Sequence, residues 1–239
     1  MGSRTDNTVV IIPSYNEART IGDIVKSVAK RGMSVFVIDD GSSDNTGRVA
    51  LDSGAKVIRN EKNRGKGAAV RVGVTYVLEK TGFEWIVIMD GDGQHHTEDI
   101  PVLMDATRDG EADLVIGNRM MDTEKMPVVR YWTNRFTSWI ISRLCGQYIP
   151  DTQCGYRIVK VSALRKMELL SEKYDIETEM LIEAAENNMK IRSAPVQTIY
   201  GDEVSEIHPV YDTLRFCALI VKCHFALMKA KRRDRIERG

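Results

Sequence analysis

The sequence of 239 residues lacks an excess of charge of either sign. Lysine and arginine together number 34, and aspartate and glutamate also number 34. A chain with this balance has no global electrostatic attraction to nucleic acid, so we expect no nucleic-acid partner. The length allows one large α/β domain with a substantial core.

Cysteine is scarce, and its spacing contains no C-x-x-C motif. The four cysteines, Cys145, Cys154, Cys217 and Cys223, therefore indicate a reduced, cytoplasmic chain. Cys217, Cys223 and the adjacent His224 could serve as metal ligands. The same three residues lie in a mostly apolar helical pattern, so burial is the favoured interpretation.

The sequence also lacks an apolar run that could cross a membrane. Near the C-terminus, "FCALIV" and "FALM" are separated by Lys222 and His224 and fall short of the ~20 apolar residues that a span needs. At the other end, "MGSRTD" is neither a signal peptide nor a myristoylation signal. We expect residues 1–7 to form a disordered tail.

Residues 209–239 predict an amphipathic helix with a basic end. The segment from Lys229 to Gly239 holds six basic residues against two acidic ones. This pattern fits peripheral attachment to the cytoplasmic face of an anionic membrane. It fits equally a helix that packs on the domain or on another subunit of a homo-oligomer.

Two nucleotide-binding motifs are missing. The stretch "NRGKGAAVRVG" does not have P-loop spacing, and no G-x-G-x-x-G follows the first apolar run, which disfavours a dinucleotide dehydrogenase. The glycine-rich stretch could still bring Lys66 to a phosphate at a helix N-terminus. Judged by this motif alone, Lys66 is more often a solvated charge.

The first half of the chain alternates short β-branched runs with helical patterns. The runs are Val9–Ile12, "VFVIDD", "AKVIRN", "WIVIMD" and "DLVIGN", and helices are expected at about 19–31, 44–52, 66–79 and 97–108. Such alternation predicts an α/β fold with a mostly parallel central sheet and helices on both faces. The second half predicts helices at about 130–144, 161–169 and 176–187 and a strand near "APVQTIY". No repeat or low-complexity linker interrupts residues 8–208, which we interpret as one domain.

Polar residues cluster where four of the predicted strands end. "PSYNE", "DDGSSD", "DGDGQHH" and "GNR" follow the first, second, fourth and fifth runs. In open α/β sheets ligands bind beyond the carboxyl ends of the strands. We therefore expect these four segments to line one crevice.

The stretch "IMDGDGQHH" places Asp90 and Asp92 directly after an apolar run. Carboxylates this close repel each other unless a cation lies between them. Their oxygens suit Mg²⁺ or Mn²⁺ that bridges to a diphosphate. Alternatively both acids only end the strand in a turn, which Gly91 and Gly93 would also fit.

A second acidic strand end, "VIDDGSSDNT", contains Asp39 and Asp40. A buried carboxylate here could accept N–H groups from a nucleobase. The alternative is a capping role for the segment, since Ser43 or Asp44 would cap the next helix well. Both roles are compatible.

In their order and spacing, "PSYNE", "DDGSSDNT", "GKGAA", "DGDGQH", "GNR" and "DTQCGYR" resemble the GT-A glycosyltransferases of family 2. Within that family the chain most resembles the dolichol-phosphate mannose synthase branch, which includes bacterial polyprenyl-phosphate sugar transferases. The resemblance covers residues 8–208. It implies a GT-A catalytic domain, a nucleoside-diphosphate sugar donor and Mg²⁺ or Mn²⁺ as cofactor.

The resemblance also implies roles for individual residues. Those matched to donor binding are Pro13, Tyr15, Glu17, Asp39, Asp40, Lys66, Asp90, Gly91, Asp92, Gln94 and Arg157, and those matched to metal binding are Asp90, Asp92, Gln94 and His208. Asp151, Gly155 and Arg157 match a D-x-x-x-G-[FY]-R signature that borders the sugar pocket. Those matched to catalysis are Asp92, then Arg119 and Arg130 facing an acceptor phosphate, and Glu177 and Glu179 near the acceptor.

The late loop "YGDEVSEIHP" departs from the branch. Ser205 is kept, but Glu206 stands where the branch carries lysine, and Asp202 and Glu203 add further negative charge. Loss of that cation removes a phosphate contact and adds like charge near a diphosphate. The donor and the acceptor class therefore stay open at this point.

The leading hypothesis is inverting, metal-dependent transfer of a hexose from a GDP-mannose or UDP-glucose type donor to a polyprenyl or dolichyl phosphate. Transfer to a soluble or glycan hydroxyl is an alternative, and it would need a general base such as Glu177 or Glu179. A non-catalytic sugar-nucleotide-binding protein is another, in which the D-x-D acids would be dispensable. A nucleotidyltransferase is disfavoured, because "IPSYNE" replaces its glycine-rich N-terminal loop.

Overall fold

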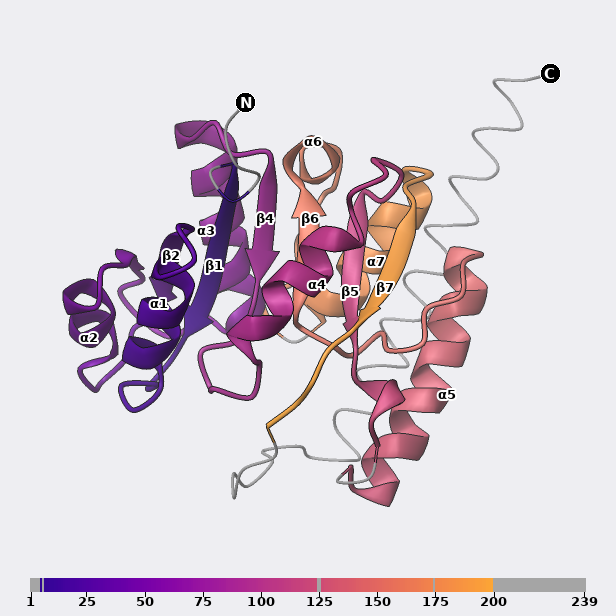
Figure 1. The fold of residues 1–239 in the computed structure, drawn as a ribbon, viewed down its shortest axis with the longest axis horizontal. Coiled ribbons are helices and arrows are strands. Elements are labelled where there is room, and N and C mark those ends of the chain that lie inside the picture. The colour runs from indigo at the N-terminus through magenta and orange to yellow at the C-terminus, as the bar shows by residue number, and fades with distance from the viewer. Residues whose placement is uncertain (1–4, 6, 124–125, 174, 200–239) are drawn as a thin grey trace.

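The computed structural model of the chain describes residues 5, 7–123, 126–173 and 175–199. Within these residues seven strands form one sheet in the order β3-β2-β1-β4-β6-β5-β7 (Figure 1). Strand β6 is antiparallel to β4 and β5, and the other pairs are parallel. The strands are β1 (Thr8–Ser14), β2 (Ser34–Asp39), β3 (Lys56–Arg59), β4 (Trp85–Ile88), β5 (Leu114–Asn118), β6 (Arg157–Lys160) and β7 (Ile191–Pro195).

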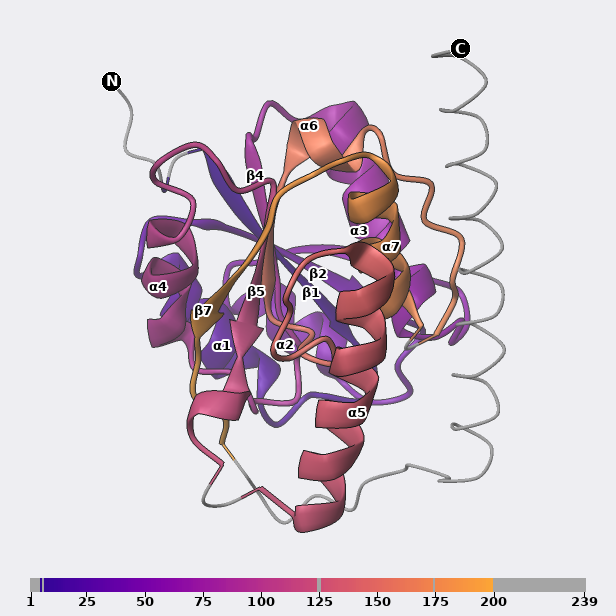
Figure 2. The ribbon, with the colours of Figure 1, turned by 90° about the vertical axis from the view of Figure 1, so that its right-hand side faces the viewer.

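Helices cover both faces of the sheet. Figure 2 shows α1 and α4 on one face and α3 and α7 on the other, with α5 packed outside α7. The α-helices are α1 (Ile21–Ala29), α2 (Thr46–Asp52), α3 (Lys66–Lys80), α4 (Ile100–Asp105), α5 (Val128–Cys145), α6 (Val161–Leu164) and α7 (Ile176–Glu186). There are two 3₁₀ turns among the described residues: η1 (Thr97–Asp99) follows the loop after β4, and η2 (Arg119–Met121) directly follows β5.

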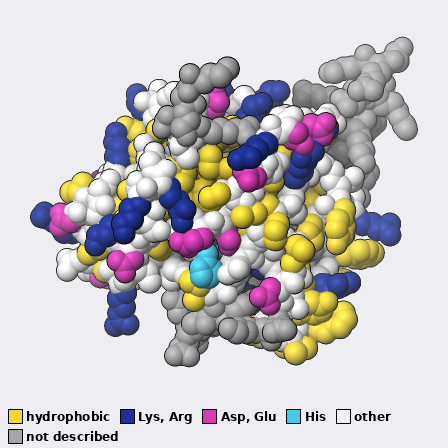
Figure 3. Space-filling model, in the orientation of Figure 1, with side chains coloured by type: hydrophobic (Ala, Val, Ile, Leu, Met, Phe, Trp, Pro, Cys, Tyr) yellow, Lys and Arg dark blue, Asp and Glu magenta, His cyan; other side chains and the backbone are white. Residues whose placement is uncertain are grey.

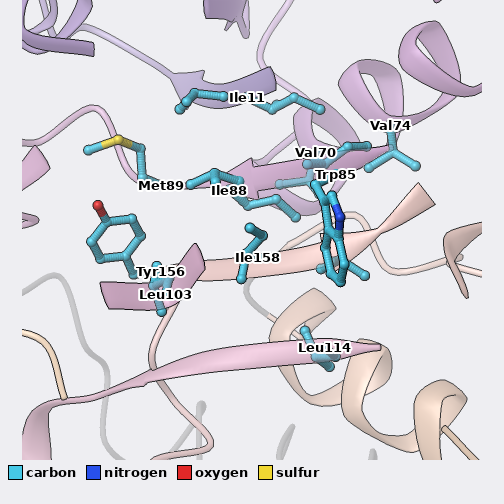
Figure 4. Packing of buried hydrophobic residues seen from close by; sticks show 14 of the residues in the cluster. Ile11, Val70, Val74, Trp85, Ile88, Met89, Leu103, Leu114, Tyr156 and Ile158 are labelled. Carbon is cyan, nitrogen blue, oxygen red and sulfur yellow. The ribbon is translucent and has the colours of Figure 1, made fainter. Parts of the chain in front are cut away.

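The core lies on both sides of the central strands. All seven residues of β1 and all four residues of β4 are buried, as expected for strands between two helical layers. Ile11, Val70 and Val74 pack between β1 and α3, while Ile158 and Leu114 continue the core across β6 and β5 (Figure 4). This continuous apolar packing fixes the strand ends that carry the polar segments.

The predicted α/β architecture is confirmed, with three local corrections. Strand β6 was not expected from the pattern, because its four residues follow a polar loop and pair in the opposite direction to the other strands. The helix expected at 161–169 ends at Leu164, and the strand expected at 194–200 is β7, which begins three residues earlier. The chain then continues through an isolated bridge between Thr198 and His95.

Several predictions lie outside the described residues. They concern the late loop with its acidic residues, His208, the helix expected at 209–239, Cys217, Cys223 and His224. Among the residues that the structure describes, no helix is both long enough and apolar enough to span a bilayer.

Candidate active site

The carboxyl ends of β1, β2 and β4 meet at one edge of the sheet, as the polar clusters predict. Asp40 N–H donates to the Ser14 carbonyl at 2.9 Å, and Met89 N–H donates to the Ile11 carbonyl at 3.2 Å. These main-chain bonds hold the loops after the three strands side by side. On the face seen in Figure 3, Asp and Glu side chains gather next to a histidine.

The loop that carries Asp90 and Asp92 is fixed by short contacts. Thr20 Oγ1 donates to the Gly91 carbonyl at 2.6 Å, and Gln94 N–H donates to Asp92 Oδ1 at 2.9 Å. A Cβ atom at position 91 would lie 2.6 Å from Ser14 Oγ, so any other residue here would displace the Ser14 hydroxyl. The two carboxylates are thereby held at the carboxyl end of β4.

Lys66 lies at the centre of the site and not in solvent. From the first turn of α3, its Nζ contacts Asp90 Oδ1 at 2.6 Å and Glu177 Oε1 at 2.7 Å. Burial opposes the charge of Lys66, but the two carboxylates outweigh that effect and raise its pKa above the ordinary value. The ammonium group of Lys66 therefore lies beside Asp90, the first acid of the D-x-D pair.

His95 is a second partner of Asp90, and the sequence pattern did not predict a role for this histidine. Its Nε2 lies 3.3 Å from Asp90 Oδ2, and its ring centroid lies 4.8 Å from that of Tyr156. Tyr156 in turn donates its hydroxyl to the His96 carbonyl at 3.0 Å. Burial by itself raises the pKa of Asp90, but Lys66 and His95 outweigh it and hold that pKa well below its usual range.

The surroundings shift the pKa of Asp92 in the opposite direction to that of Asp90. Burial, followed by the negative charge of Asp90, raises the pKa of its carboxyl above the ordinary value. Within the described residues, no cluster of three or more His, Cys, Asp or Glu side chains could by itself enclose a metal. Mg²⁺ is commonly held by one or two carboxylates together with substrate phosphates. The oxygen donors of Asp90 and Asp92 fit such an open site.

Asp39, the last residue of β2, and Asp40 directly after it organise the neighbouring loops. Asp39 accepts from Ser42 N–H at 2.9 Å and from Arg59 Nη1 at 2.8 Å. Asp40 accepts from the main-chain N–H groups of Arg64 and Gly65 at 2.9 and 2.7 Å. Both carboxylates are buried. Asp40 therefore shapes the turn that enters α3, and a nucleobase that reached either carboxylate would meet groups already held in place.

The residues of "PSYNE" occupy the end of β1 and the loop beyond it. Pro13 is a buried strand residue, whereas Tyr15 is 44% exposed at the edge of the sheet. The main chain of Glu17 donates to Thr46 Oγ1 at 2.8 Å and so ties this loop to α2. Tyr15 is thus the aromatic ring of this segment that a ligand could reach.

The helix N-terminus that could bind a phosphate is partly covered by other main chain. Ala68 N–H donates to the Glu172 carbonyl at 3.0 Å, and a Cβ at Gly67 would lie 2.6 Å from the carbonyls of Ser171 and Lys173. In this structure the 171–173 segment therefore lies where a phosphate would approach the first turn of α3. Lys66 reaches the site with its side chain instead.

Arg119 has a buried ion-pair partner. Its Nε and Nη2 donate to the two carboxylate oxygens of Asp151 at 2.8 and 3.0 Å, and Asn134 donates to the same carboxylate at 2.8 Å. Burial would raise the pKa of Asp151, but the hydrogen bonds and charge of Arg119 lower it. The guanidinium of Arg119, which directly follows β5, thereby joins the end of this strand to the loop that begins at Asp151. Asn134 on α5 carried no signal in the sequence.

Arg157 is buried behind the site. Its guanidinium donates to the carbonyls of Cys154, Glu177 and Thr152 at 2.8, 2.6 and 3.0 Å. It therefore positions the loop and the start of α7 from inside the protein. Gly155 on the same loop allows the close approach of Lys66 and Asp90, because a Cβ there would lie 2.7 and 2.9 Å from their polar atoms.

The two glutamates of α7 that the sequence matches to catalysis, Glu177 and Glu179, differ in position. Glu177 is 9% exposed and pairs with Lys66, and within the described part of the chain its buried Oε2 has no hydrogen-bond partner. Glu179 accepts from the main chain of Leu170 and Ser171 and so holds a loop. Arg130, in the first turn of α5, is partly exposed. Glu177 is the acid that the fold brings to the D-x-D pair.

Comparison with known proteins gives one matching family and several relatives. The family described as "Glycosyl transferase family 2" matches residues 9–168. The UDP-N-acetylglucosamine–dolichyl-phosphate N-acetylglucosaminyltransferase of Methanococcus voltae is 30% identical, over 81% of this chain and 86% of that protein. The undecaprenyl-phosphate mannosyltransferase of Micrococcus luteus is 33% identical, over 79% and 82%.

A solved structure shows the same fold. Glucosyl-3-phosphoglycerate synthase from Mycobacterium tuberculosis, crystallised with Mn²⁺, UDP-glucose and phosphoglyceric acid, superposes with a TM-score of 0.71 at 18% identity. The similarity covers 92% of this chain and 79% of that one. The predicted GT-A arrangement, a mostly parallel sheet between helices, is confirmed.

Proposed function

The chain belongs to glycosyl transferase family 2, and from that membership we propose inverting transfer of a hexose from a nucleoside-diphosphate sugar to a polyprenyl phosphate. Relatives named as acting on dolichyl and undecaprenyl phosphates place it in the polyprenyl-phosphate branch that its motifs predict. The observation that carries the proposal is the partly buried contact of Asp90 with Lys66 at the carboxyl end of β4. This contact places the ammonium group of Lys66 and the carboxylate of Glu177 next to the D-x-D pair, where the diphosphate of a sugar donor would lie.

In the proposed reaction Asp90 and Asp92 would hold a divalent cation, Mg²⁺ or Mn²⁺. When bound, the cation neutralises charge that develops on the leaving diphosphate. Lys66 brings a second positive charge to the same place, and His95 keeps the carboxylate of Asp90 in position. Gly155 leaves the room that this arrangement needs.

The acceptor phosphate would be bound from the α5 side. It is an anion near neutral pH, so it attacks without losing a proton and needs positioning more than a base. Arg119 is held by Asp151, which leaves Arg130 as the better candidate to contact the phosphate. The first turn of a helix adds a favourable field for an anion.

The proposal is tested by incubating the full chain with radiolabelled UDP-glucose, UDP-N-acetylglucosamine or GDP-mannose, each with undecaprenyl or dolichyl phosphate. We expect label in the organic phase with one donor, and only when Mn²⁺ or Mg²⁺ is present. Label that stays in water-soluble products would support the hydroxyl-acceptor alternative. Donor binding without any product would support the non-catalytic one.

A charge-only substitution at Glu177 separates the two acceptor classes. For a phosphate acceptor we expect Glu177→Gln to lower transfer by less than about tenfold, through a weaker hold on Lys66. A hydroxyl acceptor needs a base, and loss of one costs about 10²–10⁴-fold. The measurement is kcat with saturating donor. Glu179→Gln is the matched control, because the Glu179 carboxylate accepts main-chain bonds away from Lys66.

Gly155→Ala is expected to lower transfer about 100-fold while the protein stays folded. The new methyl group would push Lys66 and Asp90 apart, and displacements near 1 Å can cost that much in rate. The control is Gly82→Ala, since no atom lies within 4 Å of a Cβ at that position. Full activity of the Gly155 variant, with an unchanged thermal midpoint, would show that the Lys66–Asp90 contact is dispensable.

A further inference from the structure

Three charged side chains, Lys66, Asp90 and Glu177, meet at the carboxyl end of β4. Lys66 Nζ contacts Asp90 Oδ1 at 2.6 Å and Glu177 Oε1 at 2.7 Å, so one ammonium group joins two carboxylates. The Lys66 side chain is only 16% exposed, which leaves little water to weaken these contacts. We call these three residues the lysine bridge.

Both carboxylate oxygens of Asp90 already have partners from the chain. Lys66 contacts Oδ1, and His95 Nε2 lies 3.3 Å from Oδ2. In the proposed reaction the same carboxylate would bind a divalent cation. An oxygen that carries an ammonium group cannot also bind such a cation without strong repulsion between the two positive charges. Lys66 and the cation therefore compete for Asp90.

Lys66 is the partner of Asp90 that is able to move. Its ammonium group ends a flexible four-carbon stem, whereas His95 is buried with its ring packed against Tyr156. A lysine that left Asp90 would keep a counterion, because Glu177 Oε1 already contacts it. In the part of the chain that the structure describes, Glu177 Oε2 is buried and has no hydrogen-bond partner. This second oxygen could accept a further N–H of the same ammonium group.

The lysine bridge also affects how a diphosphate would bind. While Lys66 contacts both Asp90 and Glu177, two negative charges offset its single positive charge. When Lys66 gives up Asp90 to a cation, it loses one of these carboxylates and its charge becomes available to an anion. Binding of the cation and binding of the diphosphate would then favour each other, which is a coupling between two ligands.

We propose that Lys66 is an exchangeable internal cation: it occupies Asp90 until a divalent cation binds, is then held by Glu177, and so couples cation binding to binding of the donor diphosphate. The inference rests on the proposed function in one respect, that Asp90 binds the cation. The protein without donor then binds a divalent cation weakly, and the protein with donor binds it tightly. Glu177 acts in this exchange by holding Lys66, without taking a proton from the acceptor.

The test is the dissociation constant of Mn²⁺ for the full chain without any nucleotide, measured from the electron paramagnetic resonance signal of free Mn²⁺. We expect Lys66→Met to bind Mn²⁺ about tenfold more tightly than wild type, because the competitor for Asp90 is gone. Glu177→Gln should bind Mn²⁺ about fivefold more weakly, because Lys66 loses the carboxylate that would hold it. Lys80→Met and Glu79→Gln, exposed at the other end of α3, are the charge-matched controls and should bind Mn²⁺ as wild type.

A double variant separates exchange from a direct effect of the Glu177 charge on the cation. With Lys66→Met in place, there is no ammonium group to hold, so adding Glu177→Gln should change Mn²⁺ affinity little. The double variant should therefore still bind Mn²⁺ about tenfold more tightly than wild type. It also removes one charge of each sign, so it avoids the two uncompensated carboxylates that Lys66→Met leaves.

A second measurement tests the coupling itself. Calorimetric titration with UDP and with GDP, each with and without Mn²⁺, gives the factor by which Mn²⁺ tightens nucleotide binding. We expect this factor to be at least about threefold smaller in Lys66→Met than in wild type. An equal factor in the two proteins would show that Lys66 does not couple the two ligands.

The outcomes separate this proposal from the proposed function. Mn²⁺ binding no tighter than wild type in both Lys66 variants would overturn the exchange, and Lys66 would then only support Asp90. A loss of about fivefold from Glu177→Gln with and without Lys66 would assign a direct charge effect to Glu177 and also overturn it. The Mn²⁺ measurement uses no donor and no acceptor, so the expected pattern supports the exchange even if no lipid-linked sugar forms.

Discussion

Replacing Asp92 by asparagine should lower hexose transfer by at least about 100-fold while the protein stays folded. The change keeps the shape of the side chain and removes one of two anionic ligands for the cation that neutralises the leaving diphosphate. The measurement is kcat/KM over a range of Mn²⁺ concentrations, together with the circular dichroism spectrum. Near-normal turnover by Asp92→Asn would refute the metal role of the D-x-D pair.

The same variant should be slightly more stable than wild type when no ligand is bound. Burial and Asp90 raise the pKa of Asp92 in the folded state, so its charged form is disfavoured there. The folded state therefore loses stability as the pH rises through that raised pKa, and asparagine removes this loss at neutral pH. The gain in thermal midpoint should disappear below about pH 3.9, where the carboxyl is protonated in both states. Asp52→Asn, on the exposed surface of α2, is the control and should change neither activity nor midpoint appreciably.

Asp151→Ala should destabilise the fold by about 3–5 kcal/mol, because it leaves the buried guanidinium of Arg119 without its counterion. The side chain of Asp151 is fully buried and that of Arg119 is 8% exposed, and Asn134 loses the same acceptor. The measurement is the urea midpoint and slope at pH 7. Loss of Asp52, whose pair with Arg48 is exposed, should have a much smaller effect.

The pH dependence gives an independent test of this pair. Arg119 and its hydrogen bonds lower the pKa of Asp151 in the folded state against the effect of burial. The pair therefore stabilises the protein above the ordinary aspartate pKa of about 3.9, and this stabilisation is lost as the pH falls through the lowered value. The difference between wild type and Asp151→Ala should shrink at acid pH. A difference below about 1 kcal/mol at pH 7 would show that the pair is not structural and that Arg119 is available to a ligand.

Much of the fold could be predicted, because the alternation of apolar runs and polar loops depends only on residues that are close in the sequence. The runs that became β1, β2 and β4 are rich in β-branched residues, and polar loops follow them at the carboxyl edge. Strand β6 could not be predicted, since Arg157–Lys160 is short and its partners lie far away in the chain. Its antiparallel direction depends on tertiary pairing.

The sequence predicted which residues form the site, but it did not predict which of them contact one another. The sequence singled out Asp90, Asp92 and Lys66, but the contact of Lys66 with Glu177 joins residues more than a hundred positions apart. The pairing of Arg119 with Asp151 depends in the same way on how β5 and the later loop meet. Tyr156 lay within the quoted motif "DTQCGYR", yet only the structure shows that its ring supports His95.

The most direct test of the central claim, that Asp90 and Asp92 hold a cation and a sugar diphosphate, is thermal unfolding with UDP-, GDP- and dTDP-sugars, each with and without Mn²⁺. A ligand that binds only the folded state stabilises it by ~2.7 kcal/mol at a hundredfold excess over its dissociation constant. We expect one nucleotide sugar to raise the midpoint only when Mn²⁺ is present, and Asp92→Asn to lose that shift. A shift of equal size without Mn²⁺, or one that Asp92→Asn retains, would contradict the account.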